Sequence, residues 1–422
     1  MRRDRSTYRG DVPRTWFTVI SDVIDRAHLT GGEDLAVIAG QATASLGIEL
    51  GLYLVDLPQR HLHPLPPHRG DPLPIDSTVA GRAFRLVEIY AVRDRQTGRP
   101  TLWVPVLDGA HRVGMLSLAL PEDTDADDPE LRGSCWTLAG VLGQTVMSKL
   151  SQSDLLHRTR RPKPLSVSAE LLWQLLPPQT LANANMTVSA VVEYYDEAGG
   201  DGYDYDSGEQ RGYVAVFDAT GHDLQAGLVC STALAATRHA RRGGCELPEI
   251  ADRADHVVRA NTSHSRFATA LLMELDFTTG VLTYLNAGHP PPVLLRSGRM
   301  AKQLAHGRRL PLGLQHLDTA NPSPPPATER LEPGDRLLLY TDGVTEARND
   351  RGEHFGLRRL IDLVERHNAA GFPAPETLRR VAHAVLDHQR GQLHDDATLL
   401  LVEWPTPNHP RLLPAERAPV LH

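Results

Sequence analysis

The sequence predicts an α+β protein of two domains. A chain of 422 residues is too long for one ordinary domain, since domains of roughly 100–200 residues are the norm. The composition, 41% hydrophobic and 23% charged, is that of a globular protein. In the C-terminal half, strand patterns cluster between pairs of helical patterns and do not alternate with single helices. We therefore expect largely antiparallel sheets with helices packed outside them.

Charge and cysteine content exclude several classes of protein. The 44 Lys and Arg against 52 Asp and Glu give a formal charge of −8, which argues against a nucleic-acid-binding protein because such proteins need a basic face. No apolar run approaches the roughly 18–20 residues of a membrane-spanning helix, and no apolar segment follows the basic N-terminus as in a secretory signal. Cys135, Cys230 and Cys245 form no CxxC pair, which argues against a disulfide scaffold. We expect a cytoplasmic protein without nucleic-acid or membrane partners.

The first domain is expected over residues 15–155, after a flexible tail at 1–14. Apolar residues at helical spacing in TWFTVISDVIDRAHL predict a helix, and two apolar runs around Asp108-Gly109 predict a hairpin. The segment HLHPLPPHRGDPLP, which holds His61, His63 and His68, is interpreted as a proline-rich loop. Its histidines are interpreted as neighbours by coincidence and not as metal ligands.

The second domain is expected over residues 168–404. The segment before it, 156–167, is basic and twice interrupted by proline, which favours a solvated linker. Residues 405–422 are expected to be a disordered tail. Between these limits the pattern is a short amphipathic helix, strands, a helix pair, strands, a second helix pair and a last strand.

Carboxylates stand at the ends of several strand patterns of the second domain. Asp218 ends YVAVF, Asp342 follows RLLLYT, and Asp395 and Asp396 precede ATLLLVEW, while Asp201 follows a glycine pair. Each of these alone is typical of an ordinary turn. Carboxylates that converge, however, raise one another's pKa or bind a cation, and hard oxygen ligands suit Mg²⁺ or Mn²⁺.

The order of these motifs resembles the metal-dependent PPM protein phosphatases, in particular the SpoIIE-type branch with its RsbU-like regulators. The motifs are GGDGYD, DATGH, NAGHPPPVLL, LLLYTDGVTEARN and DDATLLLV. The resemblance implies a two-layer antiparallel β-sandwich flanked by helix pairs. It also implies hydrolysis of phosphoserine and phosphothreonine in proteins with two Mn²⁺ or Mg²⁺ ions.

The resemblance also assigns residues of this chain. Asp218 would bridge both ions, and Asp218 and Asp342 would be catalytic. His222 would orient water or protonate the leaving seryl oxygen, or else only cap the following helix. Asp396 is the less favoured acid of the last pair. The metal ligands implied are Asp201, Asp218, Ala219 through its carbonyl oxygen, Asp342 and Asp395.

One departure from the family pattern is Asp223, which follows Gly221-His222 where the family has Gly-His-Gly. A Cβ there restricts the turn, and a carboxylate added near the metals would shift metal affinity or weaken activity. The alternative to an enzyme is therefore a catalytically weak binding or regulatory module of the same fold.

The first domain resembles a GAF sensor domain, through TVAGRAFR, TLWVPVLDG and HRVGMLSLAL followed by a long helix. The resemblance implies either a small-ligand site or a contact in a homodimer, and the sequence leaves both open. In similar proteins the connecting helix carries a signal to the phosphatase by dimer rearrangement. The resemblance of the second domain to the RsbU-like regulators implies a phosphorylated anti-sigma antagonist of bacterial signalling as the partner.

Overall fold

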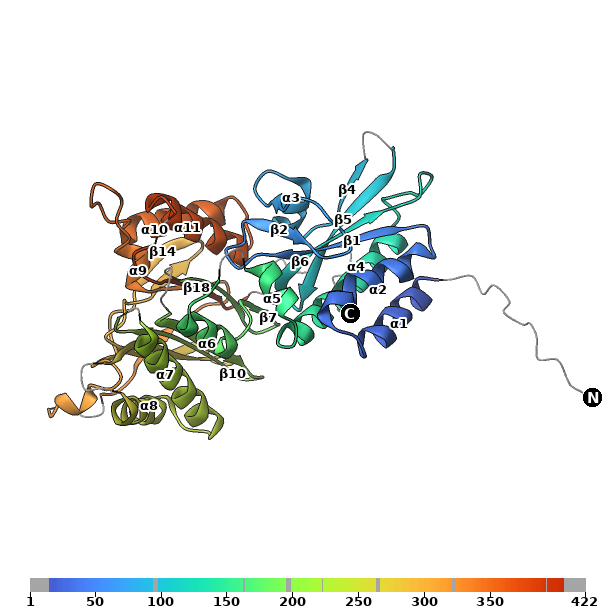
Figure 1. The fold of residues 1–422 in the computed structure, drawn as a ribbon. Coiled ribbons are helices and arrows are strands. Elements are labelled where there is room, and N and C mark those ends of the chain that lie inside the picture. The colour runs from blue at the N-terminus through green and yellow to red at the C-terminus, as the bar shows by residue number, and fades with distance from the viewer. Residues whose placement is uncertain are drawn as a thin grey trace, which may run out of the picture. The chain divides into compact units, whose positions relative to one another are not determined.

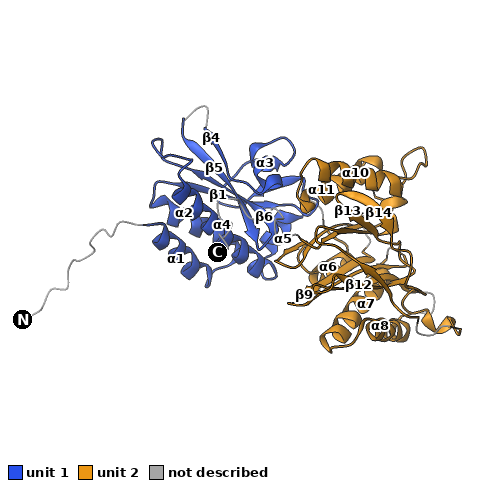
Figure 2. Cartoon of the chain, turned by 180° about the vertical axis from the view of Figure 1, so that it is seen from behind, with its two compact units in different colours: residues 1–162, 413–422 blue, residues 163–412 orange. Residues whose placement is uncertain are grey.

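The computed structural model describes residues 15–93, 98–161, 164–194, 199–221, 223–262, 266–320, 324–391 and 393–405. The chain divides into two compact units, residues 1–162 with 413–422 and residues 163–412 (Figure 2). Both predicted tails, 1–14 and 405–422, lie outside the described residues except for residue 405. Among the helices of the described ranges, none combines the length and apolarity that crossing a bilayer requires.

An antiparallel sheet of six strands forms the centre of the first unit (Figure 1). Its strands are β1 (Glu49–Val55), β2 (His61–Pro64), β3 (Leu73–Pro74), β4 (Tyr90–Arg93), β5 (Pro100–Asp108) and β6 (His111–Ala119). Their order across the sheet is β3-β2-β1-β6-β5-β4. The hairpin predicted at Asp108-Gly109 is confirmed as the turn between β5 and β6.

Helices cover both faces of this sheet. They are α1 (Trp16–Ala27), α2 (Leu35–Ala44), α3 (Val79–Leu86) and α4 (Pro129–Leu150). Alternate residues of a strand point to opposite faces. Leu52 and Leu54 of β1 accordingly join the core formed with α1, α2 and α4, whereas Tyr53 and Val55 pack in the cluster that contains Phe84 of α3.

Part of the segment expected to be a solvated linker is a helix of the first unit. This helix, α5 (Asp154–Arg160), begins after Ser153, whose hydroxyl accepts a hydrogen bond from the Leu156 amide at 3.4 Å. Leu156 and Arg160 are buried, and the Arg160 side chain donates to the carbonyl of Val55. The two residues are spaced i, i+4 and therefore share one face of the helix. Two buried positions in a short basic segment are too few to reveal a helix in the sequence.

The second unit contains two antiparallel sheets. The strands of the first are β9 (Asp201–Ser207), β10 (Arg211–Ala219), β11 (Ala268–Asp276), β12 (Val281–Ala287), β15 (Arg308–Arg309) and β16 (Ala327–Arg330). Those of the second are β7 (Thr180–Ala182), β8 (Thr187–Glu193), β13 (Val293–Arg296), β14 (Arg299–Gln303), β17 (Arg336–Tyr340) and β18 (Ala397–Glu403). The orders are β15-β12-β11-β10-β9, with β16 on β12, and β14-β13-β17-β18-β8-β7. Among the described strand pairs of this unit, only the short β12–β15 pairing is parallel, and an isolated parallel bridge joins Ala270 to Gly288.

The two sheets share one core, and each carries a helix pair outside it (Figure 1). Val214 and Val216 of β10 pack in the core between the sheets, whereas Ala215 and Phe217 pack toward the helices. The helices of this unit are α6 (Val167–Leu175), α7 (Leu224–Arg242), α8 (Leu247–Asn261), α9 (Asp342–Thr345), α10 (Leu357–Ala369) and α11 (Ala374–His388). Helices α7 and α8 flank the first sheet, and α10 and α11 flank the second. The predicted α+β class, with its two-layer antiparallel sandwich and flanking helix pairs, is confirmed.

Candidate functional site

Two of the predicted acids lie opposite each other on neighbouring strands. Asp201 is the first residue of β9, and Asp218 lies one residue before the end of β10. The strand register pairs Asp218 directly with Asp201. Directly opposed residues of antiparallel strands have Cα atoms about 4.5–5.5 Å apart, so the fold of the first sheet alone brings these two carboxylates together.

The second sheet supplies the other acids from one edge. Asp342 begins α9, separated from the end of β17 by one residue, and Asp395 and Asp396 directly precede β18, the antiparallel neighbour of β17. Gly343 permits the close approach of the two segments. A Cβ at Gly343 would lie 2.0 Å from the carbonyl oxygen of Asp396 and 3.4 Å from the Cβ of Asp395. Any side chain at that position would therefore push α9 away from the turn before β18.

Hydrogen bonds connect the acids of the two sheets. The Thr341 hydroxyl donates to Oδ2 of Asp201 at 2.8 Å and accepts from the Thr398 amide at 3.0 Å. The Gly200 amide donates to Oδ2 of Asp396 at 2.6 Å. Our sequence reasoning missed Thr341 and Thr398, although each stands beside an acid motif, in YTDG and in DDAT.

The adjacent acids Asp395 and Asp396 differ in environment. The Asp396 side chain is buried and accepts amide hydrogen bonds, so it holds the turn at Gly200. The Asp395 side chain is exposed, and its Oδ1 accepts from the Asp396 amide at 2.9 Å. This difference supports the preference for Asp395 as the ligand, and the ligand role itself stays a prediction.

The acids raise one another's pKa values. Burial, then the charges of Asp218 and Asp396, raise the pKa of Asp201 well above its ordinary value. Burial, then Asp342, Asp395 and Asp396, raise the pKa of Asp218 to about 8. Burial, Asp395 and Glu346 raise that of Asp342. Asp218 is thus electrostatically connected both to Asp201 and to the acids of the second sheet. A cluster of this kind either keeps protons or takes up a cation.

Ala219 and His222 complete the predicted set. The Ala219 amide donates to the Gly200 carbonyl at 3.0 Å, and a Cβ at Gly200 would lie 3.1 Å from the Ala219 carbonyl oxygen. The proposed carbonyl ligand therefore lies beside the turn that precedes Asp201. His222 lies outside the described residues, so its roles remain predictions from the sequence.

The structure gives Asp223 a role that the sequence did not indicate. Its backbone φ is −109°, which any residue adopts, and its Oδ1 accepts from the Ala226 amide at 3.0 Å as the N-cap of α7. Arg266 donates to its other oxygen at 2.7 Å. These contacts, the Ala226 amide first, lower the pKa of Asp223. The expectation that its Cβ would restrict the turn is wrong, because the left-handed residue there is Gly221, with φ +91°.

The donor set fits hard divalent cations. Carboxylate and carbonyl oxygens suit Mg²⁺ and Mn²⁺, and such ions offset the mutual repulsion of the acids. All five aspartates are among the described residues, and no three of them have ligand oxygens that all lie within 4.8 Å of one another. The acids are therefore spread more widely than the ligands of one small ion.

Comparison with known proteins identifies relatives of this unit. A family model described as Stage II sporulation protein E (SpoIIE) matches residues 208–405. Phosphoserine phosphatase RsbU of Bacillus subtilis (strain 168) is 25% identical over 241 residues, which cover 56% of this chain and 69% of RsbU. Phosphoserine phosphatase RsbP of the same organism is 25% identical over 233 residues, which cover 53% of this chain and 54% of RsbP.

Solved structures include similar domains. The crystal structure of the RsbU and RsbW domains of a Mycobacterium tuberculosis protein is 28% identical, with a TM-score of 0.44. That similarity covers 53% of this chain and 63% of the other chain. The chain therefore spans between about half and seven tenths of the length of these three relatives.

Proposed function

Because the C-terminal unit is a SpoIIE-type domain of the PPM phosphatase family, we propose that the chain hydrolyses phosphoserine and phosphothreonine in proteins with two Mn²⁺ or Mg²⁺ ions. The observation that carries this proposal is the set of aspartates that raise one another's pKa at adjoining ends of two sheets. Keeping several ionised carboxylates in such a cluster is costly unless cations bind there. The relatives RsbU and RsbP, both named phosphoserine phosphatases, support the reaction.

The proposed ligands divide between the two sheets. Asp201 on one side and the pair Asp342 and Asp395 on the other would each hold one ion, with Ala219 adding its carbonyl oxygen. Asp218 is the residue that can contribute to both, because its charge interacts with Asp201 and with the acids of the second sheet. Bound divalent cations supply a water of lowered pKa and neutralise the non-bridging phosphoryl oxygens.

Other residues of the chain position these ligands or transfer protons. The Thr341 hydroxyl fixes one carboxylate oxygen of Asp201, and Asp396 fixes the turn that leads into Asp201. His222 is proposed to orient water or to protonate the leaving seryl oxygen. No covalent enzyme intermediate is required by this arrangement.

The first unit is proposed to regulate this activity. Its six-stranded antiparallel sheet, with helices on both faces, supports a GAF-like fold. The proposed substrate is a phosphorylated anti-sigma antagonist, and the proposed setting is bacterial cytoplasmic signalling, as the resemblance to RsbU-like regulators implies. Control would act through a small ligand of the GAF-like unit or through a homodimer.

The alternative, a catalytically weak binding module, has lost its main support. It depended on a carboxylate added beside the metals at Asp223. That carboxylate instead caps α7 and pairs with Arg266. No other described residue favours the alternative.

The test compares Asp342→Ala with a matched control, Asp362→Asn, which changes an exposed acid of α10 in the same unit. Hydrolysis of a phosphoserine protein or an aryl phosphate is measured with Mn²⁺ and with chelator. We expect turnover by the wild type to require Mn²⁺. Asp342→Ala should lose roughly 100-fold or more of the Mn²⁺-dependent turnover. Removing only a group that supports a metal ligand already costs about 10–100-fold. Asp362→Asn should match the wild type.

Two results would reject the phosphatase. One is hydrolysis at the same negligible rate by wild type and Asp342→Ala with Mn²⁺ present, which would favour the binding module. The other is turnover that persists in chelator. Circular dichroism of both variants verifies that the fold is intact, so that a loss of activity reports on the site.

A further inference from the structure

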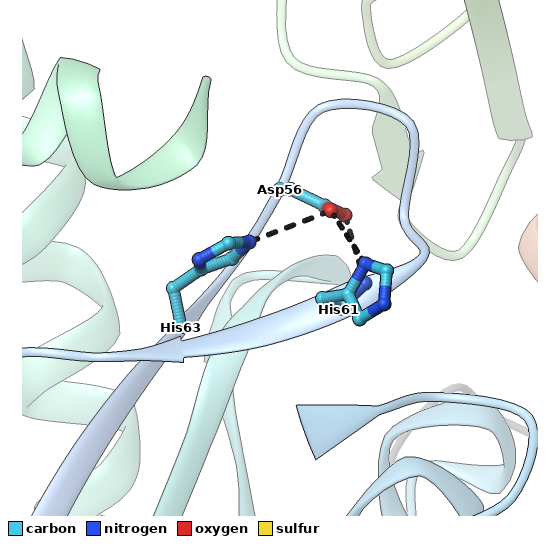
Figure 3. Close-up of side chains that lie close together, drawn as sticks. All are labelled: Asp56, His61 and His63. Atoms are coloured by element: carbon cyan, nitrogen blue, oxygen red, sulfur yellow. Dashed lines mark hydrogen bonds and ion pairs between the residues drawn. The ribbon is translucent and has the colours of Figure 1, made fainter. Parts of the chain in front are cut away.

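A second group of candidate ligands lies in the first unit, apart from the aspartates. Asp56 follows β1, and His61 and His63 lie on β2, where their spacing of two places both side chains on one face. Figure 3 shows both imidazoles turned toward the Asp56 carboxylate. Within the described residues, this is the group of three whose ligand atoms all lie within 4.8 Å of one another. The segment predicted as a loop is a strand here, and that strand aligns the two histidines.

The carboxylate of Asp56 is held in position by the backbone. Its Oδ1 accepts from the Arg60 amide at 2.7 Å and from the His61 amide at 3.1 Å. Its Oδ2 is the atom that faces both rings. The side chain is buried, with 1% exposed. Backbone contacts to one oxygen of a ligand carboxylate fix the orientation of the other oxygen.

The distances in this group are those of ligands around an ion and not those of hydrogen bonds. Oδ2 of Asp56 lies 3.5 Å from Nδ1 of His61 and 3.5 Å from Nε2 of His63. A nitrogen-to-oxygen hydrogen bond is about 2.7–3.2 Å long. Ligands of a tetrahedral ion with metal–ligand distances of about 2.0–2.2 Å are about 3.3–3.6 Å apart.

One nitrogen of the group is buried without a hydrogen bond. Nε2 of His63 is covered from solvent and makes no hydrogen bond to a described residue. A buried polar atom that makes no hydrogen bond costs about 1–3 kcal/mol, so a metal ion bound to this nitrogen would remove that cost. His68, from the same stretch of sequence, has a different neighbour: its Nε2 lies 2.6 Å from the Tyr53 hydroxyl.

We propose that Asp56, His61 and His63 form a binding site for one divalent transition-metal ion, such as Zn²⁺, in the first unit. Two imidazoles with a single carboxylate suit Zn²⁺, Co²⁺, Ni²⁺ or Fe²⁺ better than Mg²⁺ or Ca²⁺, which require several oxygen ligands. The ion would join the end of β1 to β2.

The test is Zn²⁺ binding to the full chain by calorimetry in excess Mg²⁺, which occupies oxygen-ligand sites. The variants are His61→Gln and His63→Gln, and the matched control is His68→Gln. We expect wild type and His68→Gln to bind one Zn²⁺ and to gain thermal stability from it, because a ligand of the folded state stabilises that state. Each of the other two variants should lose at least about tenfold in affinity, since the ligand set is cut from three to two.

The proposal is overturned if the wild type binds no Zn²⁺ under these conditions, or if His61→Gln and His63→Gln bind it as the wild type does. Melting in chelator verifies the folding of each variant. Should a variant not fold, Co²⁺ bound to the wild type decides the question. Intense visible absorption bands of the bound Co²⁺ support the proposal, because they indicate nitrogen ligands in a low-coordinate site. The weak spectrum of a six-coordinate oxygen site refutes the proposal. Because the site is tested without phosphatase activity, the two proposals fail independently.

Discussion

The Asp223 carboxylate makes two contacts, and neither is with an aspartate of the proposed metal site. One oxygen caps α7 through the Ala226 amide, and the other pairs with Arg266. Arg266 also donates to the Thr220 carbonyl at 2.6 Å, so it connects the start of α7 to the end of β10. At the scale of single residues, an acid in an unexpected position is thus explained by a local cation and a helix end.

We predict that Asp223→Gly keeps the metal-dependent activity, because neither contact of Asp223 reaches the proposed ligands. Glycine at an N-cap costs only a few tenths of a kcal/mol, whereas Asp223→Ala should cost about 0.5–2 kcal/mol in the free energy of unfolding. Asparagine keeps the capping oxygen and serves as the control. The measurements are urea unfolding of the C-terminal unit and hydrolysis with Mn²⁺. Loss of activity in Asp223→Gly with stability intact would give Asp223 a direct part in the reaction.

The pKa of Asp223, lowered by its partners, also gives the stability a direction with pH. A carboxylate whose pKa falls on folding stabilises the protein above its ordinary pKa, and this contribution is lost as the pH falls through the lowered value. The difference in stability between wild type and Asp223→Ala should therefore shrink in acid.

At the scale of secondary-structure elements, the site depends on how closely α9 approaches the turn before β18. Gly343 is the point of closest approach, where the position of a Cβ would be 2.0 Å from the Asp396 carbonyl oxygen. An overlap with backbone cannot be relieved by a side-chain rotation, so one of the two segments must move. The movement would separate Asp342 from Asp395.

We predict that Gly343→Ala reduces Mn²⁺ affinity and activity at least about tenfold, since disturbing the support of metal ligands typically costs 10–100-fold. The matched control is Gly208→Ala in the same unit, where a Cβ meets only ordinary contact, 3.4 Å from the Arg211 carbonyl oxygen. Activity titrated against Mn²⁺ separates weaker binding from a lower maximal rate. If Gly343→Ala bound Mn²⁺ as tightly as the wild type, the close approach of α9 to the turn before β18 would not determine the metal affinity.

The elements also show what the sequence could and could not predict. Asp218 and Asp342 were recognisable because each follows an apolar strand pattern, and strand ends gather at sheet edges. Thr341 was not, because its two hydrogen bonds reach segments 140 and 57 residues away along the chain. The strand at His61 and His63 was missed for a different reason: the prolines around it are typical of loops, and β2 tolerates them because it is short.

At the scale of the whole molecule, the site aspartates of the second unit repel one another and thereby lower the stability of its β-sandwich. The buried Asp201 and the half-buried Asp218 are the clearest case, because the charge of Asp218 raises the pKa of Asp201 and the second-sheet acids raise the pKa of Asp218. Hydrophobic cores on both sides of the sheets compensate for this cost. Functional sites commonly trade stability for activity in this way.

This balance predicts the pH dependence of the metal-free protein. A carboxylate whose pKa rises on folding stabilises the protein fully below its ordinary pKa of 3.8, and that contribution is lost as the pH rises to about 8 for Asp218. The metal-free wild type should therefore lose stability between pH 6.5 and 8 relative to Asp218→Asn, which cannot ionise. A change of one in pKa corresponds to about 1.4 kcal/mol, so part of this shift is measurable by denaturant unfolding in chelator.

Mn²⁺ should make the wild type more stable than Asp218→Asn, because it should stabilise only the wild type. Parallel pH profiles for the two proteins, or a less stable Asp218→Asn at pH 8 without metal, would show that repulsion at Asp218 does not limit stability.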